Sequence, residues 1–138
     1  MKHLFWLATF LFLHFTVVTA QATSKPAGSW TLTKLSMSGS LKSYKLFSKV
    51  KLNFEDTGDR INGQSTCNNY NGPCALDSGA PGAFDASDIM ATKKFCKNGM
   101  STESAYLQAL EEADSYSLKG KTLTLYKDKK VVAVFKKS

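Results

Sequence analysis

The sequence predicts a single α+β domain built on an antiparallel sheet. Over several short stretches apolar residues alternate with polar ones, which is the period of a half-buried strand. One stretch repeats its apolar residues at the spacing of an amphipathic helix. Short turns link the strands on both sides of this helix, and this connectivity favours antiparallel pairing with the helix packed on the sheet.

The N-terminus, residues 1–20, has the layout of a secretory signal peptide. It has a charged start at Lys2, an apolar run, and small residues suited to cleavage at its end. The apolar run is shorter than the roughly 18 residues of a spanning helix, and His14 interrupts it, so an uncleaved anchor is the weaker alternative. Residues 21–28 are expected to be a flexible lead-in. No cysteine lies near the cleavage position to carry a lipid anchor.

Residues 29–138 are predicted to form one domain, because the chain that remains after cleavage, about 118 residues, is long enough for one modest core. Cleavage also removes both histidines, His3 and His14. Without imidazole, the mature chain has no Ser-His-Asp or Cys-His nucleophile and no histidine-based zinc site.

The charge of the mature chain does not indicate a nucleic-acid partner. Setting Lys2 aside leaves 17 basic and 11 acidic residues, and Arg60 is the single arginine, the residue type that contacts bases and phosphates bidentately. The lysines cluster in turns and near the C-terminus rather than among stacked aromatics. Solubility is the expected role of this lysine-rich surface, with weak attraction to anionic lipid or polymer as the alternative.

The first strands can be placed from their alternation. Residues 29–37 form the first strand, and the serine-rich residues 36–46, which have no period, are expected to be a loop. Residues 49–56 alternate apolar and polar side chains, and residues 60–67 run back after a glycine-containing turn, which predicts a β-hairpin.

A corner between strands is predicted at residues 68–72, NNYNG, because asparagine forms local hydrogen bonds and tolerates left-handed backbone. A short strand over residues 73–76 and another around residues 84–87 follow. After the helix, two further strands are expected, one around Leu123 and one over residues 131–136.

The helix is predicted over residues 101–116, with Ser101 or Thr102 as N-cap and Glu103 in the first turn. Its packed face consists of Tyr106, Leu107, Leu110 and Ala113, and its polar face of Gln108, Glu111 and Glu112. Core packing is also the expected role of ten aromatic side chains: Trp30, Phe47, Phe54, Tyr70, Phe84, Phe95, Tyr106, Tyr116, Tyr126 and Phe135.

Short motifs give little support to an enzyme. GKT at residues 120–122 lacks the glycine of a phosphate-binding loop, since Ser115 stands in its place, and it lies between strands rather than before a helix. The aspartate pairs in EDTGD and FDASD do not match the calcium-binding loop and are typical of turns. No metal or cofactor is predicted.

The three cysteines are Cys67, Cys74 and Cys96, and no two form a CxxC pair, so neither a zinc ribbon nor a thioredoxin-like redox centre is indicated. In an oxidising compartment two of them would pair and one would stay free, and the sequence allows three pairings. A Cys67–Cys96 bridge would close a loop of about 30 residues and stabilise the domain by about 3 to 4 kcal/mol, whereas Cys67–Cys74 would contribute less.

Several motifs in order resemble the META domain family of HslJ-like heat-shock and virulence-associated proteins. They are Trp-x-Leu at Trp30, Arg-Ile-x-Gly-x-Ser-x-Cys-Asn-x-Tyr-x-Gly from Arg60 to Gly72, Met-Ala-Thr-x-x-x-Cys from Met90 to Cys96, and Glu-x-x-Tyr-Leu-x-x-Leu from Glu103 to Leu110. The motif residues singled out are Trp30, Gly63, Cys67, Asn68, Tyr70, Gly72, Thr92 and Cys96. The resemblance covers residues 29 to 137, and the 36–48 segment lies outside it.

The resemblance implies an antiparallel, partly open β-barrel-like sheet with one packed α-helix, similar in shape to type III secretion pilotins. It also implies that Cys67 and Cys96 are the recurring cysteines, neighbours that form the disulfide, and that Cys74 is a free thiol. It implies a secreted or periplasmic protein without enzyme activity.

The expected function is binding of an envelope or extracellular partner in a stress response, by a monomer with no membrane span after cleavage. The alternative is a carrier of a lipid or other apolar ligand in the open barrel, suggested by the likeness to pilotins and by the Phe, Tyr and Leu content. An enzyme that uses Cys74 or an aspartate pair is the third and weakest hypothesis.

Overall fold

The computed structural model describes residues 24–79 and 81–138. The predicted signal peptide, residues 1–20, lies outside the described residues, as do residues 21–23 of the lead-in. Over the two described ranges, no helix has both the length and the apolar character needed to cross a membrane.

The described chain forms eleven strands, one α-helix and one 3-10 helix. In chain order these are β1 (Gly28–Met37), β2 (Ser40–Lys42), η1 (Lys45–Lys49), β3 (Lys51–Phe54), β4 (Arg60–Gln64), β5 (Asn69–Pro73), β6 (Ala75–Leu76), β7 (Gly82–Asp85), β8 (Met90–Ala91), α1 (Met100–Glu112), β9 (Ser115–Lys119), β10 (Thr122–Lys127) and β11 (Lys130–Lys137).

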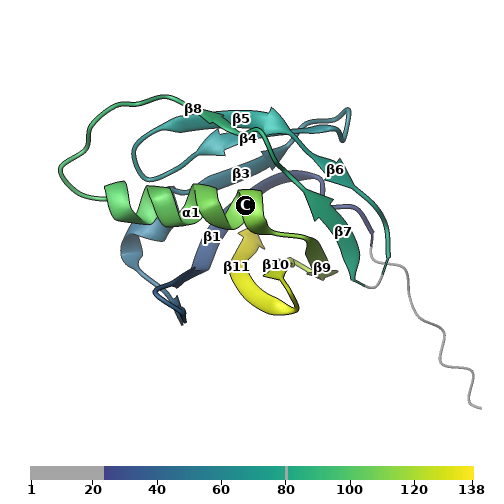
Figure 1. The fold of residues 1–138 in the computed structure, drawn as a ribbon. Helices are drawn as coiled ribbons and strands as arrows, with labels where there is room; N and C mark the ends of the chain where they lie inside the picture. Colours follow the sequence, from purple (N-terminus) through teal and green to yellow (C-terminus); the bar gives the residue numbers. More distant parts are fainter. Residues whose placement is uncertain (1–23, 80) are drawn as a thin grey trace, which may run out of the picture.

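The strands pair antiparallel into one curled sheet with the order β6-β7-β9-β10-β11-β1-β3-β4-β5-β8, and β2 pairs with β1 beside this path. The sheet bends around α1, which packs against β1 and β11 (Figure 1). The two ends of the order, β6 and β8, do not pair with each other. The predicted α+β fold, an antiparallel and partly open barrel-like sheet with one helix, is confirmed.

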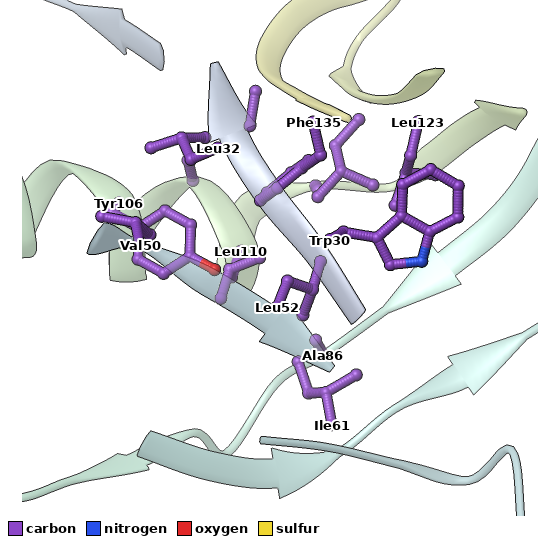
Figure 2. Close-up of a cluster of buried hydrophobic side chains, with 14 of the residues drawn as sticks. Trp30, Leu32, Val50, Leu52, Ile61, Ala86, Tyr106, Leu110, Leu123 and Phe135 are labelled. Atoms are coloured by element: carbon purple, nitrogen blue, oxygen red, sulfur yellow. The ribbon is translucent and has the colours of Figure 1, made fainter. Parts of the chain in front are cut away.

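The core fills the space between the sheet and the helix. Trp30 and Leu32 of β1 point into it together with Phe135 of β11 and Leu110 of α1, and each is at most 2% exposed (Figure 2). A register shift between Leu32 and Lys34 changes the alternation of β1, so that Leu35 rather than Lys34 is buried.

The segment predicted as a loop over residues 36–46 is more ordered than expected. β1 continues to Met37, a turn with positive φ at Ser38 and Gly39 leads into β2, and η1 follows. Phe47 anchors η1 in the core with 1% of its surface exposed. The sequence shows no alternation of apolar and polar residues here because β2 is only three residues long and largely exposed.

The predicted corner at residues 68–72 is wrong. The turn begins three residues earlier, over residues 65–68. Residues 69–73 form strand β5, which pairs with β4 in the register Gly63↔Tyr70. None of the asparagines has a positive φ. Burial of Tyr70 against the core outweighs the turn preference of its neighbours.

The helix begins and ends earlier than predicted. Gly99, with φ of 108°, occupies the N-cap position, and neither Ser101 nor Thr102 caps the helix. Residues 115–119 form strand β9, so three strands rather than two follow the helix. Buried Tyr116 belongs to this strand and not to the helix.

Candidate functional site

A buried polar cluster joins the start of α1 to the turn before β5. At its centre is the Glu103 side chain, which projects from the first turn of the helix and is 6% exposed. Its Oε1 accepts a hydrogen bond from Asn68 Nδ2 at 2.6 Å. Its Oε2 accepts from the backbone N–H groups of Asn68 (2.9 Å) and Cys67 (3.1 Å) and from the Ser65 hydroxyl. The turn over residues 65–68 therefore closes around one carboxylate.

These hydrogen bonds determine the charge of Glu103. Burial acts to raise the pKa of the carboxyl group, but the donors from Ser65, Asn68 and Cys67 outweigh it and hold the pKa below its usual range. Glu103 is therefore an anion at neutral pH whose oxygen atoms are already occupied. A general base would need a pKa near the working pH and a free oxygen atom, so this arrangement serves structure rather than proton transfer.

Asn68 connects the same cluster to the segment that follows β8. Its Oδ1 accepts from the Thr92 hydroxyl at 2.8 Å and from the Lys94 N–H at 2.7 Å. Its Nδ2 donates to the Lys94 carbonyl at 3.1 Å as well as to Glu103. Both donors and both acceptor positions of the amide are used, so no other side chain of this size could replace it.

The structure pairs Cys67 with Cys96 in a disulfide with a Cα–Cα distance of 6.0 Å. This bond lies next to the Asn68 contacts and fixes the segment around residue 95 from its other side. Cys74 lies elsewhere as a free, buried thiol. Burial and the negative charge of Asp85 raise the pKa of the Cys74 thiol to about 12, so it is not a thiolate nucleophile at neutral pH.

A second polar contact inside the core involves Tyr70 and Tyr106, whose hydroxyl oxygens are 2.6 Å apart. Tyr70 donates its single proton to the Lys51 carbonyl at 2.8 Å, so Tyr106 is the donor between the two. Burial raises the pKa of both phenols. Gly63 leaves room for this contact, since a Cβ there would stand 1.9 Å from the Lys51 carbonyl oxygen and 2.7 Å from the Tyr70 hydroxyl.

Two further motif residues, Trp30 and Gly72, lie outside both the Glu103 cluster and the Tyr70–Tyr106 contact. Trp30 donates from Nε1 to the Ala27 carbonyl at 3.1 Å, and the Lys137 ammonium lies 4.7 Å from the centre of its ring. Gly72 packs closely against Ile89, whose Cα would be 3.1 Å from a Cβ at that position. The structure thus brings together Cys67, Asn68, Thr92 and Cys96, and it places Trp30 and Gly72 at other close contacts.

The cluster has an exposed neighbour, which we call the Phe95 groove. It is an open groove of about 510 Å³ between β8 and α1, lined by Asn68, Ile89, Ala91, Thr92, Lys93, Lys94, Phe95, Met100, Glu103 and Leu107. Phe95 is 86% exposed, so its predicted place in the core is wrong. The adjacent backbone is held by Asn68 and the disulfide, and this positions the Phe95 side chain outside the core.

The aspartate pairs form local turn contacts. Asp59 accepts from the Thr57 hydroxyl at 2.6 Å, and Asp85 from the Ser87 N–H at 3.0 Å. In residues 24–79 and 81–138, no three His, Cys, Asp or Glu side chains are grouped so that they could hold a metal ion.

The fold and the cluster define a class of small domain in which a curled antiparallel sheet, one helix and a disulfide are joined by buried polar contacts. This chain belongs to the META domain family, whose sequence model matches residues 22–138.

Comparison with solved structures supports the fold. The chain is similar to an NMR structure of a protein from Burkholderia xenovorans, with a TM-score of 0.66 and 22% identity over 100% of this chain and 98% of the other. A second NMR structure gives a TM-score of 0.55 at 22% identity over 79% of this chain and 87% of the other. No curated protein matches the chain.

Proposed function

We propose that this chain is an exported, non-catalytic META-domain protein that binds a partner protein, in the cell envelope or outside the cell, as part of a stress response. The observation that carries the proposal is the position of Phe95. Phe95 (86% exposed) lines the same groove as Met100 (37% exposed), and neighbouring exposed apolar side chains of this kind often mark interaction sites.

Local structure supports a binding role for Phe95. Lys94, on one side of it, is held through its N–H and its carbonyl by Asn68, and Cys96, on the other side, is bonded to Cys67. A residue held in this way loses little conformational entropy when a partner covers it, which favours binding.

Export and the lack of catalysis have separate support. A disulfide is stable in oxidising compartments such as the periplasm and the extracellular space. The polar groups of the Glu103 cluster are occupied by one another, and the Cys74 thiol is buried with a raised pKa. The carrier alternative has less support, because side chains of the core, including Tyr106 and Phe135, fill the concave side of the sheet.

A photo-crosslinking amino acid at position 95 tests the proposal in cells that produce the full chain. We expect a covalent adduct with one envelope or extracellular protein, and none from position 44. Tyr44 is the matched control because it is an exposed aromatic residue (48%) that does not line the Phe95 groove. Equal adducts from both positions, or none from position 95, would refute the binding role. N-terminal sequencing of the exported protein should begin near Gln21.

A further inference from the structure

We propose that the Phe95 groove binds an extended, acidic segment of the partner that also carries apolar side chains. This inference rests on the proposed function, since it specifies the chemistry of the partner. Three properties of the groove support it: its shape, its apolar lining and its unpaired positive charge.

The shape suits an extended chain. One wall is the segment 89–95, which contains the short terminal strand β8 paired with β5, and the other wall is the first half of α1. An extended segment that enters between a terminal strand and a helix can lie along the strand and place alternate side chains in the groove. A volume of about 510 Å³ accommodates one or two such side chains.

The lining includes four large apolar side chains. Phe95 is 86% exposed and Met100 is 37% exposed, while Ile89 and Leu107 are half-buried. Burial of these surfaces by one apolar side chain of the partner would supply the main favourable energy, and the rigid backbone around Phe95 would supply register.

The charge selects an acidic partner. Lys93 and Lys94 line the groove, Lys97 follows Phe95 by two residues, and residues 89–102 contain no acidic residue. Within the described ranges, the ion pairs join Lys127 to Asp114 and Asp128, so these three lysines lack a carboxylate partner. The carboxylate in the lining, Glu103, is already bound by Asn68 and its neighbours.

The same charges would attract an anionic bilayer, but the shape favours a peptide. Ile89 and Leu107 line the groove and are half-buried, so a flat lipid surface would contact them less than Phe95, which is 86% exposed. A peptide segment can contact the walls and the projecting ring together.

Selection from a display library of random ten-residue peptides tests the inference. The library is selected for binding to the exported form of the chain. The selected peptides should be enriched in Asp or Glu and should contain at least one large apolar residue. In NMR titrations of the best peptide, shifts should be confined to the groove residues. Phe95→Ala should weaken binding about thirtyfold, and Lys93→Glu with Lys94→Glu about tenfold or more.

Two variants serve as controls. Tyr44→Ala removes an exposed aromatic side chain and Lys121→Glu reverses an exposed lysine, both outside the groove, and neither should change binding. Phe95→Ala should keep the wild-type melting temperature, because its side chain is largely exposed, so that loss of binding is not loss of folding.

The inference is overturned if selection yields no enriched peptide, if the enriched peptides are basic or neutral, or if their binding does not depend on Phe95. Binding to phosphatidylglycerol vesicles that depends on Phe95, without peptide enrichment, also overturns it in favour of a membrane surface. A crosslinked protein from position 95 together with a failed selection would leave the proposed function standing and reject only the acidic segment.

Discussion

Asn68 and Glu103, 35 residues apart in the chain, are joined by two hydrogen bonds. The Asn68 backbone N–H donates to Oε2 of Glu103 at 2.9 Å, and the Asn68 side-chain amide donates to Oε1 at 2.6 Å. This pair connects the turn before β5 to the first turn of α1. Through the Asn68 amide, it also reaches the segment that carries Phe95.

Replacement of Glu103 by Gln should lower the free energy of unfolding by about 2 to 4 kcal/mol. The amide has one acceptor oxygen instead of two, and its NH2 group would face N–H donors of the 65–68 turn. Urea denaturation measures the change. Glu111→Gln, on the exposed face of the same helix, is the control and should alter the stability by less than about 0.5 kcal/mol. Equal effects of the two substitutions would contradict a central role for Glu103.

The stability should fall in acid because of the same carboxylate. The folded pKa of Glu103 is below its unfolded value, so its contribution is present above the ordinary glutamate pKa, about 4.3, and is lost as the pH falls through the folded pKa. Glu103→Gln removes this dependence, so the difference between wild type and variant should shrink below about pH 4. Asp114 also has a lowered pKa, but it is present in both proteins, so its contribution cancels in the stability difference between them. A constant difference from pH 3 to pH 7 would be inconsistent with this account.

The two buried tyrosines should respond unequally to loss of their hydroxyls. Tyr70→Phe removes the bond to the Lys51 carbonyl and leaves the Tyr106 hydroxyl without its acceptor, so it should cost about 2 kcal/mol. Tyr106→Phe removes one donor to Tyr70 and should cost about 1 kcal/mol or less. The double variant should cost less than the sum of the single ones, and additivity would show that the hydroxyls do not interact.

Gly63→Ala should destabilise the protein by about 3 kcal/mol or more, because a Cβ cannot stand 1.9 Å from the Lys51 carbonyl oxygen without separating β3 from β4. Gly72→Ala should cost less, since its nearest contact would be 3.1 Å. Thermal unfolding of both variants gives the comparison, and the opposite order would disprove this explanation of Gly63.

Thiol titration should find no reactive cysteine in the native protein, one after denaturation without reductant, and three after reduction. The first result follows from burial of Cys74, whose thiol pKa is raised to about 12, and the second from the Cys67–Cys96 bond. Cys74→Ala should reduce the second value to zero. Three thiols in denatured, unreduced protein from an oxidising compartment would exclude the disulfide.

The sequence predicted the hairpin of β3 and β4 because its alternation spans two facing strands. The sequence does not separate β9 from α1. The strand has only two alternating apolar residues, Tyr116 and Leu118, and they directly follow the helical repeat. Phe95 is predicted in the core but lies on the surface, because hydrophobicity alone does not show whether the neighbouring backbone directs a side chain outward.

The role of Glu103 was partly visible in the sequence. It precedes Tyr106 by three residues and Leu110 by seven, which places it on the packed face of the helix, where a charged residue needs partners. Those partners, Ser65 and Asn68, are distant in the chain, so only the tertiary structure could identify them.

The position of β11 has a consequence for how the chain is handled before it folds. β11 lies between β10 and β1 in the sheet and comes after the other described strands in the chain. Before β11 pairs, the sheet is divided between β10 and β1, one edge of β1 is open, and Leu32 lacks its cross-strand neighbour Phe135. Until β11 pairs, the core is therefore incomplete, and the open edge of β1 can pair with another chain.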